Sequence, residues 1–352
     1  MPFDLIRQLV VSAPLVHPEP GFRDAIWRLK YCLRGLAQAR LTRQWFSLLA
    51  RPELRPVTDT HPHIFSKLQR PYLSRTLGTR QRLEALTAHY SFVAGHLSEE
   101  MMREVFSPSG FHLTSIPLGD AGHLDLRLLY RQSFCKEGDL TIWLQDCQSG
   151  LPVYSLTFSI VAGEDGKRQV FVGGLQGFAQ IHDEGRVISM TRAMHGVRPK
   201  ALVVFALQQL ALEWECSRIR AVSDSMHIYQ HFIRRKDIAA RYDEFWLERG
   251  GKPGADDLFD LPLTATARPL TEIKVNKRQM YRRRYALMEQ VAEQIRARLQ
   301  QHYMAPTRRN CVWDSSPALE RQLASGIACR SGFAARARRK IRGLVGLRSK
   351  RT

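Results

Sequence analysis

The stretch FVGGLQG, residues 171–177, decides the fold of this chain, because two adjacent glycines interrupt an otherwise typical buried strand. The run 170–172 has the β-branched and aromatic side chains that favour strands. Gly173 and Gly174 offer no side chain for packing and lose more backbone entropy on folding than other residues. The pair therefore predicts either a β-bulge or a strand whose bare backbone lies against an extended ligand.

Alternating apolar residues on both sides of this stretch predict an antiparallel meander. The expected strands lie at 124–130, 140–144, 154–160 and 169–172, with turns at 136–138, 148–150 and 164–167. Residues 200–214, KALVVFALQQLALEW, predict a strongly apolar helix that must pack against this sheet. A further short strand is expected at 218–223.

Helical spacing of apolar residues predicts helices before and after the sheet, at 22–50, 79–106 and 271–302. This order of elements predicts an α+β fold with a mostly antiparallel sheet and a packed central helix. Four parts are expected: a helical N-terminal region (1–110), an α+β domain (111–270), a long basic helix (271–305) and a basic tail (306–352).

The charge of the chain favours anionic partners. The 352 residues include 53 Lys and Arg against 33 Asp and Glu, a formal net charge of +20. Residues 330–352 contain nine basic residues and no acidic one, and their apolar side chains form one stripe at helical spacing: Phe333, Ala337, Ile341, Leu344 and Val345. This pattern predicts a helix that lies on an anionic membrane surface, with a disordered tail or a nucleic-acid-binding tail as alternatives.

Other features predict a protein kept in the cytoplasm. The N-terminal stretch lacks the pattern of a signal peptide, and no run of 18 apolar residues is present. The six cysteines show no CxxC pair or zinc-type spacing, which is typical of reduced, buried thiols.

The segment HGVRPKA, residues 195–201, is a second candidate for ligand binding. Pro199 fits the first turn of the apolar helix, where no amide donor is lost. The free amides of that turn, together with Arg198 and Lys200, predict a phosphate-binding site. A solvated, charged helix start is the alternative interpretation.

The strand at 169–174, the helix start at 196–201 and the strand at 218–223 resemble the core of the GCN5-related N-acyltransferase fold. In that family the central strand lies beside the pantetheine arm of the donor, a helix start holds the pyrophosphate, and the next strand splays away. The resemblance implies donor binding by Val172, Gly173, Gly174, Gln176, Gly196, Arg198 and Lys200. Arg198-Pro199-Lys200 replaces the glycines of that family's loop, so acyl-CoA, acyl carrier protein and aminoacyl-tRNA all stay open as donors.

Three residues are candidates for catalysis. Tyr229 follows the splayed strand, where related acyltransferases place a tyrosine that protonates the leaving thiolate; the alternative role for this residue is packing on a helix. The general base would be Asp224, Glu244 or His195. No catalytic triad motif, Walker loop or dinucleotide fingerprint is found.

Histidine spacing does not predict a metal site. His227 and His231 would share a helix face, but the glutamate of the zinc-protease motif is missing. His61 and His63 lie in a proline-rich segment. We therefore expect no bound metal.

A set of motifs spread over residues 25–300 resembles the VirK/YbjX family of Gram-negative bacteria. The motifs are Arg70-Pro71-Tyr72-Leu73, His89-Tyr90, Phe134-Cys135-Lys136-Glu137-Gly138, Gly173–Gly177, Arg198-Pro199-Lys200, Tyr242–Trp246 and the basic run 277–284. That family has no assigned reaction and is associated with virulence, the cell envelope and survival of cationic antimicrobial peptides.

The resemblance implies a cytoplasmic protein peripheral to the inner membrane. Two hypotheses follow for its activity: transfer of an acyl or aminoacyl group to an envelope component, or a non-catalytic adaptor that binds membrane or nucleic acid. An acidic carrier protein or tRNA would suit the basic surface as partner.

Overall fold

The computed structural model describes residues 2–178, 184–231 and 241–302. The tail 330–352, with its predicted membrane helix, lies outside these residues. None of the helices in this described part combines the length and the hydropathy that a membrane-spanning helix requires.

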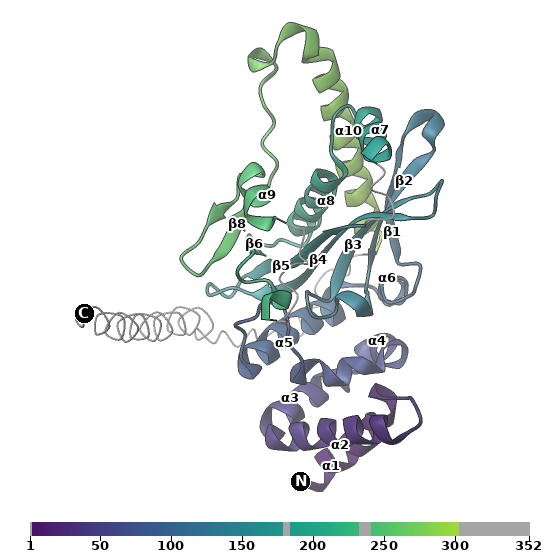
Figure 1. Cartoon of the computed structure of the whole chain (residues 1–352), viewed down its shortest axis with the longest axis vertical. Helices are drawn as coiled ribbons and strands as arrows, with labels where there is room; N and C mark the ends of the chain where they lie inside the picture. Colours follow the sequence, from purple (N-terminus) through teal and green to yellow (C-terminus); the bar gives the residue numbers. More distant parts are fainter. Residues whose placement is uncertain (1, 179–183, 232–240, 303–352) are drawn as a thin grey trace, which may run out of the picture.

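One sheet of the order β1-β2-β3-β4-β5-β6-β8-β7 organises the fold (Figure 1). Its strands are β1 (Phe111–Pro117), β2 (His123–Leu129), β3 (Leu140–Asp146), β4 (Pro152–Ala162), β5 (Arg168–Gly177), β6 (Arg218–Val222), β7 (Lys252–Pro253) and β8 (Leu258–Leu261). All neighbouring pairs are antiparallel except β5 and β6, which run parallel over 169–172 and 218–221. The predicted α+β class, meander and mostly antiparallel sheet are confirmed.

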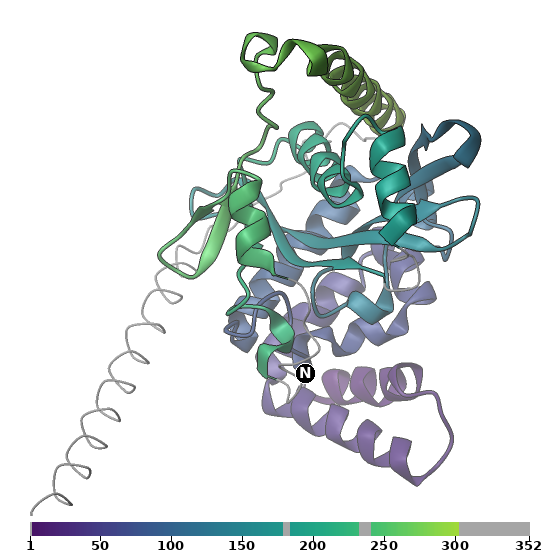
Figure 2. The same ribbon diagram turned by 45° about the horizontal axis from the view of Figure 1, so that its top comes forward.

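The helices lie on both sides of this sheet. They are α1 (Pro2–Val16), α2 (Phe22–Ala37), α3 (Ala39–Leu49), α4 (Arg55–Thr60), α5 (Thr79–His96), α6 (Glu99–Val105), α7 (Glu184–Ala193), α8 (Pro199–Glu213), α9 (Tyr242–Glu248) and α10 (Val275–Gln300). The N-terminal helices gather below the sheet and α8 and α10 above it (Figure 1, Figure 2). α5 packs against β4 from one side, whereas α8 packs against β3 and β4 from the other.

Helix α8 is apolar all round because it is buried on two sides. It lies between the sheet and α10 and contacts both of them. Trp214, directly after the helix, is fully buried, and its ring contacts Phe92 of α5 and Phe158 of β4. The central packed helix that the sequence predicts is therefore present.

The glycine pair forms a β-bulge within β5. In the pairing of β4 with β5, Thr157 lies opposite Gly174 but the next residue, Phe158, lies opposite Val172. Gly173 is the extra residue of the bulge. The strand continues through the glycines to Gly177, instead of ending at them as we expected.

Candidate functional site

The loop between β2 and β3 fills the space beside the glycine pair. A Cβ atom added at Gly173 would overlap the backbone carbonyl of Glu137, and one added at Gly174 would overlap the carboxylate of the same residue. Gly138 is needed for the same reason, since its Cβ would lie 2.6 Å from the Phe158 carbonyl oxygen. The bare backbone at the bulge therefore receives a segment of the chain itself, and the β-bulge, one of the two interpretations that the glycine pair allowed, is present.

Glu137 is the centre of a buried polar group that we call the Glu137 cluster: Glu137, Gln176, His227 and Tyr242. Gln176 Nε2 donates to both carboxylate oxygens of Glu137, at 2.7 and 3.0 Å. His227 Nε2 lies 3.3 Å from Glu137 Oε1, and the His227 ring stacks on that of Tyr242. Gln176, which we predicted to orient a donor, orients this carboxylate.

Helix α9 closes the wedge between β5 and β6 beyond their parallel pairing. The Tyr242 hydroxyl accepts a hydrogen bond from the Leu175 amide at 3.2 Å, and Trp246 Nε1 donates to the Val222 carbonyl at 2.9 Å. Asp224 fixes the start of α9, because its carboxylate accepts from the Tyr242 amide at 2.8 Å. In return, the Asp224 amide donates to Asp243. Asp224, a predicted general base, thus holds the backbone of α9.

Tyr229 lies beside the Glu137 cluster. Its ring centroid is 5.6 Å from that of His227, and Lys136 Nζ lies 5.2 Å from the ring on another side. Burial, and then the negative charge of Glu137, raise the pKa of Tyr229 to about 12. The hydroxyl is protonated at neutral pH, as the predicted role of acid requires, but its raised pKa makes it a weaker proton donor than an ordinary tyrosine.

A separate cleft of about 700 Å³ opens at the start of α8. We call it the α8 cleft; its lining includes Tyr154 of β4, Thr191 and Arg192 of α7, His195, Gly196, Arg198–Ala201, Phe245 and Glu248 of α9, Arg249 directly after α9, and Met280 of α10. The structure thus brings together four predicted site residues, His195, Gly196, Arg198 and Lys200. Val172, Gly173, Gly174 and Gln176 lie in β5 and do not line this cleft; Gly173, Gly174 and Gln176 contact Glu137 instead.

The α8 cleft is electropositive. Four cations line it, Arg192, Arg198, Lys200 and Arg249, against the single carboxylate of Glu248. Glu248 accepts from both Arg198 and Arg249, so one negative charge is shared by two positive ones. The positive end of the α8 dipole adds to this field, and the arrangement suits an anion.

Lys200 and Gly196 are held in place by neighbouring side chains. Lys200 Nζ lies 3.9 Å from the centroid of the Phe245 ring, and burial lowers the pKa of its ammonium. Gly196 has a φ of 84° and its missing side chain leaves room for the Arg284 guanidinium, which donates to the His195 carbonyl at 3.1 Å. The basic run on α10 therefore supports the wall of this cleft.

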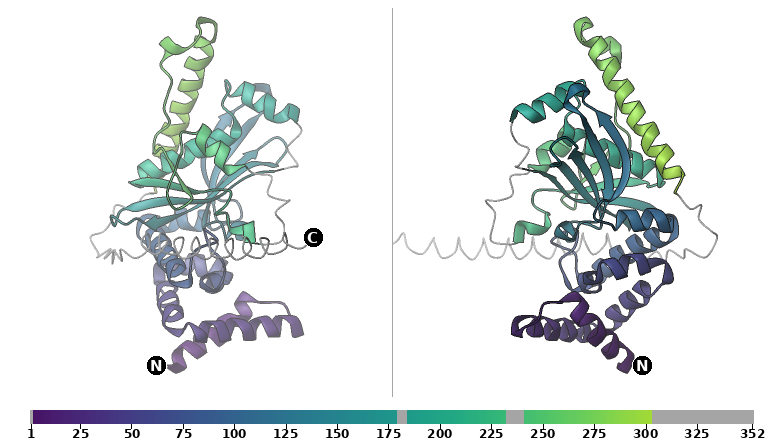
Figure 3. Two further views of the ribbon diagram at one scale, coloured as in Figure 1. Left: turned by 60° about the vertical axis from the view of Figure 1, so that its left-hand side comes forward. Right: turned by 90° about the vertical axis from the view of Figure 1, so that its right-hand side faces the viewer.

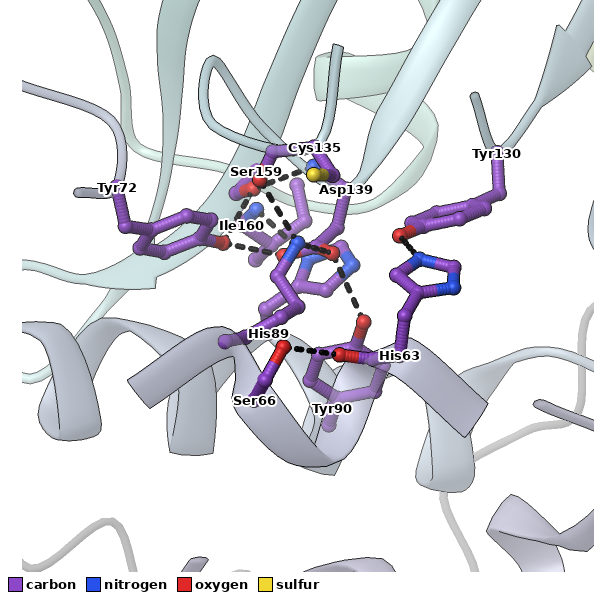
Figure 4. A network of polar contacts seen from close by, with 11 residues as sticks. His63, Ser66, Tyr72, His89, Tyr90, Tyr130, Cys135, Asp139, Ser159 and Ile160 are labelled. Atoms are coloured by element: carbon purple, nitrogen blue, oxygen red, sulfur yellow. Dashed lines mark hydrogen bonds and ion pairs between the residues drawn. The ribbon is translucent and has the colours of Figure 1, made fainter. Parts of the chain in front are cut away.

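A second buried network joins the N-terminal helices to the sheet (Figure 4). Asp139, fully buried, forms an ion pair with Lys67 and accepts from the hydroxyls of Tyr72 and Tyr90. Its backbone amide donates to Ser159 Oγ at 3.0 Å. Burial alone would raise the pKa of Asp139, but Lys67 and the hydrogen bonds hold it below its ordinary value.

The loop before β3 has a role that the sequence pattern did not predict. We expected residues 136–138 to form only a turn of the meander, and in the structure Glu137 and the nearby Asp139 are 0% and 1% exposed. Three glycines were the signal in the sequence that could have revealed this close packing. Gly138, Gly173 and Gly174 are all required where the loop crosses β4 and β5.

Metal-type ligands approach one another at one place in the described part of the chain. Single ligand atoms of His123, Asp125 and Cys147 lie within 4.8 Å of one another. Asp125 is already paired with Arg127 at 2.8 Å and accepts from Ser115 at 2.6 Å. The absence of a metal stays a prediction. The His231 side chain lies outside the described residues.

Comparisons with known proteins identify relatives that are described as uncharacterized. A family model described as "Protein of unknown function (DUF535)" matches residues 21–297. The "Uncharacterized protein YbjX" of Escherichia coli (strain K12) is 33% identical over 274 residues, which are 76% of this chain and 82% of that protein. An uncharacterized protein of Haemophilus influenzae is 29% identical over 80% of this chain and 91% of its own length. No solved structure matches.

Proposed function

The chain belongs to the DUF535 family, as the VirK/YbjX motifs predicted, and from this premise we propose that it is an acyl- or aminoacyltransferase acting on the cell envelope. It would hold the phosphate groups of an activated donor in the α8 cleft and pass the acyl group to an amine or hydroxyl of an envelope component. The observation that carries this proposal is the α8 cleft itself, an electropositive cavity at the helix start that the sequence predicted to bind phosphate.

The order and direction of the strands support an acyltransferase-like core. The sheet contains a single parallel pair among its described strands, β5 and β6, and α8 lies on the connection between them. Past Val172 and Ala221 this pairing ends. A parallel pair that diverges, with a helix start beside it, is the feature on which the resemblance to the GCN5-related N-acyltransferase fold rests.

The Glu137 cluster and the neighbouring Tyr229 would supply the base and the acid that group transfer requires. His227 is 3% exposed; its Nε2 faces Glu137, and its Nδ1 is buried with no hydrogen-bond partner among the described residues. A carboxylate on one ring nitrogen and a free second nitrogen is the arrangement of an oriented general base. We assign His227 as the base for the acceptor and Tyr229 as the acid for the leaving group.

Ligand binding tests the proposal. We expect acyl-CoA, acyl carrier protein loaded with an acyl group, or aminoacyl-tRNA to raise the melting temperature of the full chain by several degrees. Arg198→Ala/Lys200→Ala would remove this shift, whereas Arg40→Ala/Arg43→Ala, which removes two exposed cations of α3, would keep it. If none of the three donors stabilises the wild-type chain, the transferase proposal falls.

Catalysis needs its own readout. His227→Gln and Tyr229→Phe would each lower turnover by about 10²-fold or more while leaving the donor-induced shift in melting temperature in place. Loss of the shift together with turnover would instead indicate that these residues hold the fold.

A non-catalytic adaptor is the second candidate, and the closed wedge favours it. Glu137 and Tyr242 occupy the edge and face of β5 where the donor arm would lie in the related enzymes. An adaptor would bind membrane or nucleic acid without turnover. The two candidates differ in a deletion strain that is sensitive to cationic peptides. If the protein is an adaptor, Arg198→Ala/Lys200→Ala would restore resistance as well as the wild type does. If it is a transferase, the same variant would fail to restore resistance.

A further inference from the structure

The N-terminal helices α1 and α2 form a hairpin at one end of the molecule, far from the α8 cleft (Figure 1, Figure 3). They contact each other and η2, the 3₁₀ segment Pro62–Gln69. Of the large apolar side chains that are exposed in the described part of the chain, most belong to these two helices. Single exposed apolar residues are common, but a concentration of them marks an interaction surface.

The exposed apolar residues of α2 form one continuous stripe, which we call the α2 stripe: Phe22, Ile26, Leu29, Leu33 and Leu36. Their spacing of four, three, four and three residues places them on one face of an α-helix. Each is between 36% and 83% exposed. Because these side chains face solvent, they do not contribute to the hydrophobic core of the protein.

The opposite face of α2 is fixed to the rest of the protein. Tyr31 is buried and its hydroxyl shares a hydrogen bond with Ser12 of α1 at 2.9 Å. Gly35 lies so close to Leu9 that an added Cβ would be 2.6 Å from it, and the Gly35 carbonyl accepts from Thr42 at 2.9 Å. The α2 stripe therefore cannot turn inward without breaking this packing.

Positive charges flank the α2 stripe. Arg23, Lys30 and Arg34 lie on one side of the α2 stripe, about 100° around the helix axis from the middle of the stripe. Between residues 22 and 43 there are six basic residues and a single acidic one, Asp24. Trp27, on the same flank, is 39% exposed and has the amphipathic ring that favours a membrane–water interface.

We propose that the α1–α2 hairpin docks the protein on an anionic lipid bilayer, with the α2 stripe inserted among the acyl chains and the flanking cations at the headgroups. An apolar stripe beside a cationic flank is the pattern of a helix that lies in the plane of such a surface. This docking goes beyond the proposed transfer reaction, since it concerns a surface that shares no residue with the α8 cleft or the Glu137 cluster.

The positive charge beside the α2 stripe disfavours two other partners for it, the tail 330–352 and a second copy of the chain. The tail 330–352 is itself basic, with nine cations and no acid, so covering the stripe with it would bring like charges together. A second copy in a twofold arrangement would place the same cations opposite one another. Anionic lipid satisfies the apolar stripe and its cationic flank at once.

Co-sedimentation of the full chain with vesicles tests the proposal. We expect binding to phosphatidylcholine vesicles that contain roughly one third phosphatidylglycerol, and little binding to phosphatidylcholine alone. Leu29→Glu/Leu33→Glu would lower the partition coefficient at least tenfold. Leu247→Glu, which changes an equally exposed leucine of α9, is the matched control and would keep it.

Three results would overturn the docking proposal. The first is unchanged binding by Leu29→Glu/Leu33→Glu. The second is loss of binding on deletion of 330–352 while the double variant still binds, which would assign the membrane contact to the tail. The third is a wild-type dimer, measured by sedimentation equilibrium without lipid, that the double variant abolishes. Donor-induced stabilisation is expected to be the same in all these variants, so failure here and failure of the transferase proposal are distinguishable.

Discussion

A double-mutant cycle at the β5 bulge tests whether the glycine pair accommodates the chain's own Glu137. Alanine at Gly174 would place its Cβ on the Glu137 carboxylate, which is buried and bonded to Gln176. Alanine at Gly173 would place its Cβ on the backbone carbonyl of the same residue. The two substitutions are chemically identical and adjacent, but only the first conflicts with a group that a second mutation can remove.

The geometry gives the expected magnitudes. Overpacking makes Gly174→Ala destabilising by about 2–3 kcal/mol. Glu137→Ala alone would cost about 1–3 kcal/mol, because it leaves Gln176 and His227 without their buried acceptor. In the double variant the overlap no longer exists, so its unfolding free energy would be within about 1 kcal/mol of that of Glu137→Ala. The coupling free energy is therefore expected to be about 2–3 kcal/mol.

Urea unfolding of the four proteins, followed by circular dichroism, measures this coupling. Glu137→Gln is the control, since it keeps the volume of the side chain and should not rescue Gly174→Ala. Gly173→Ala should be rescued by neither substitution of Glu137. If Gly174→Ala and Glu137→Ala destabilise additively, the glycines do not make room for Glu137 and the case for a ligand at the bulge would return.

Three further predictions concern the buried network and the tail. Burial lowers the pKa of His89 to about 4 and that of His63 to about 3. As the pH falls below 6.5, both histidines therefore become protonated in the unfolded chain while they are still neutral in the folded chain, which favours unfolding. Each histidine is expected to lower the unfolding free energy by about 2 kcal/mol at pH 5 relative to pH 7.5; a urea midpoint that does not change with pH would contradict this. Asp139→Asn leaves the Lys67 ammonium buried without its counter-ion and should cost about 3–5 kcal/mol, with Lys67→Met restoring part of the loss; equal destabilisation of the single and double variants by urea would refute the pairing. Deletion of 330–352 should reduce co-sedimentation with anionic vesicles without abolishing it, and unchanged sedimentation would show that the tail does not bind membrane.

The class of the fold and the position of one candidate site were predictable from the amino-acid pattern alone. Apolar periodicity predicted β2 to β6 and α8, because each of these elements buries a regular pattern of side chains. Pro199 with its neighbouring cations predicted the helix start that the structure places in the α8 cleft. The sequence motifs predicted the family, because a motif can be recognised without knowledge of the contacts that its residues make in the fold.

The role of the glycine pair could not be predicted without the folded structure. Missing side chains show that something approaches the backbone closely, and they do not show whether it is a ligand or another part of the chain. The partner, Glu137, lies far away in sequence and resembles a residue of an exposed turn. The same limit applies to His227 and Tyr229, whose chemistry depends on a carboxylate that folding brings to them. Likewise, the α2 stripe is ordinary amphipathic sequence until the fold packs its opposite face and leaves it exposed.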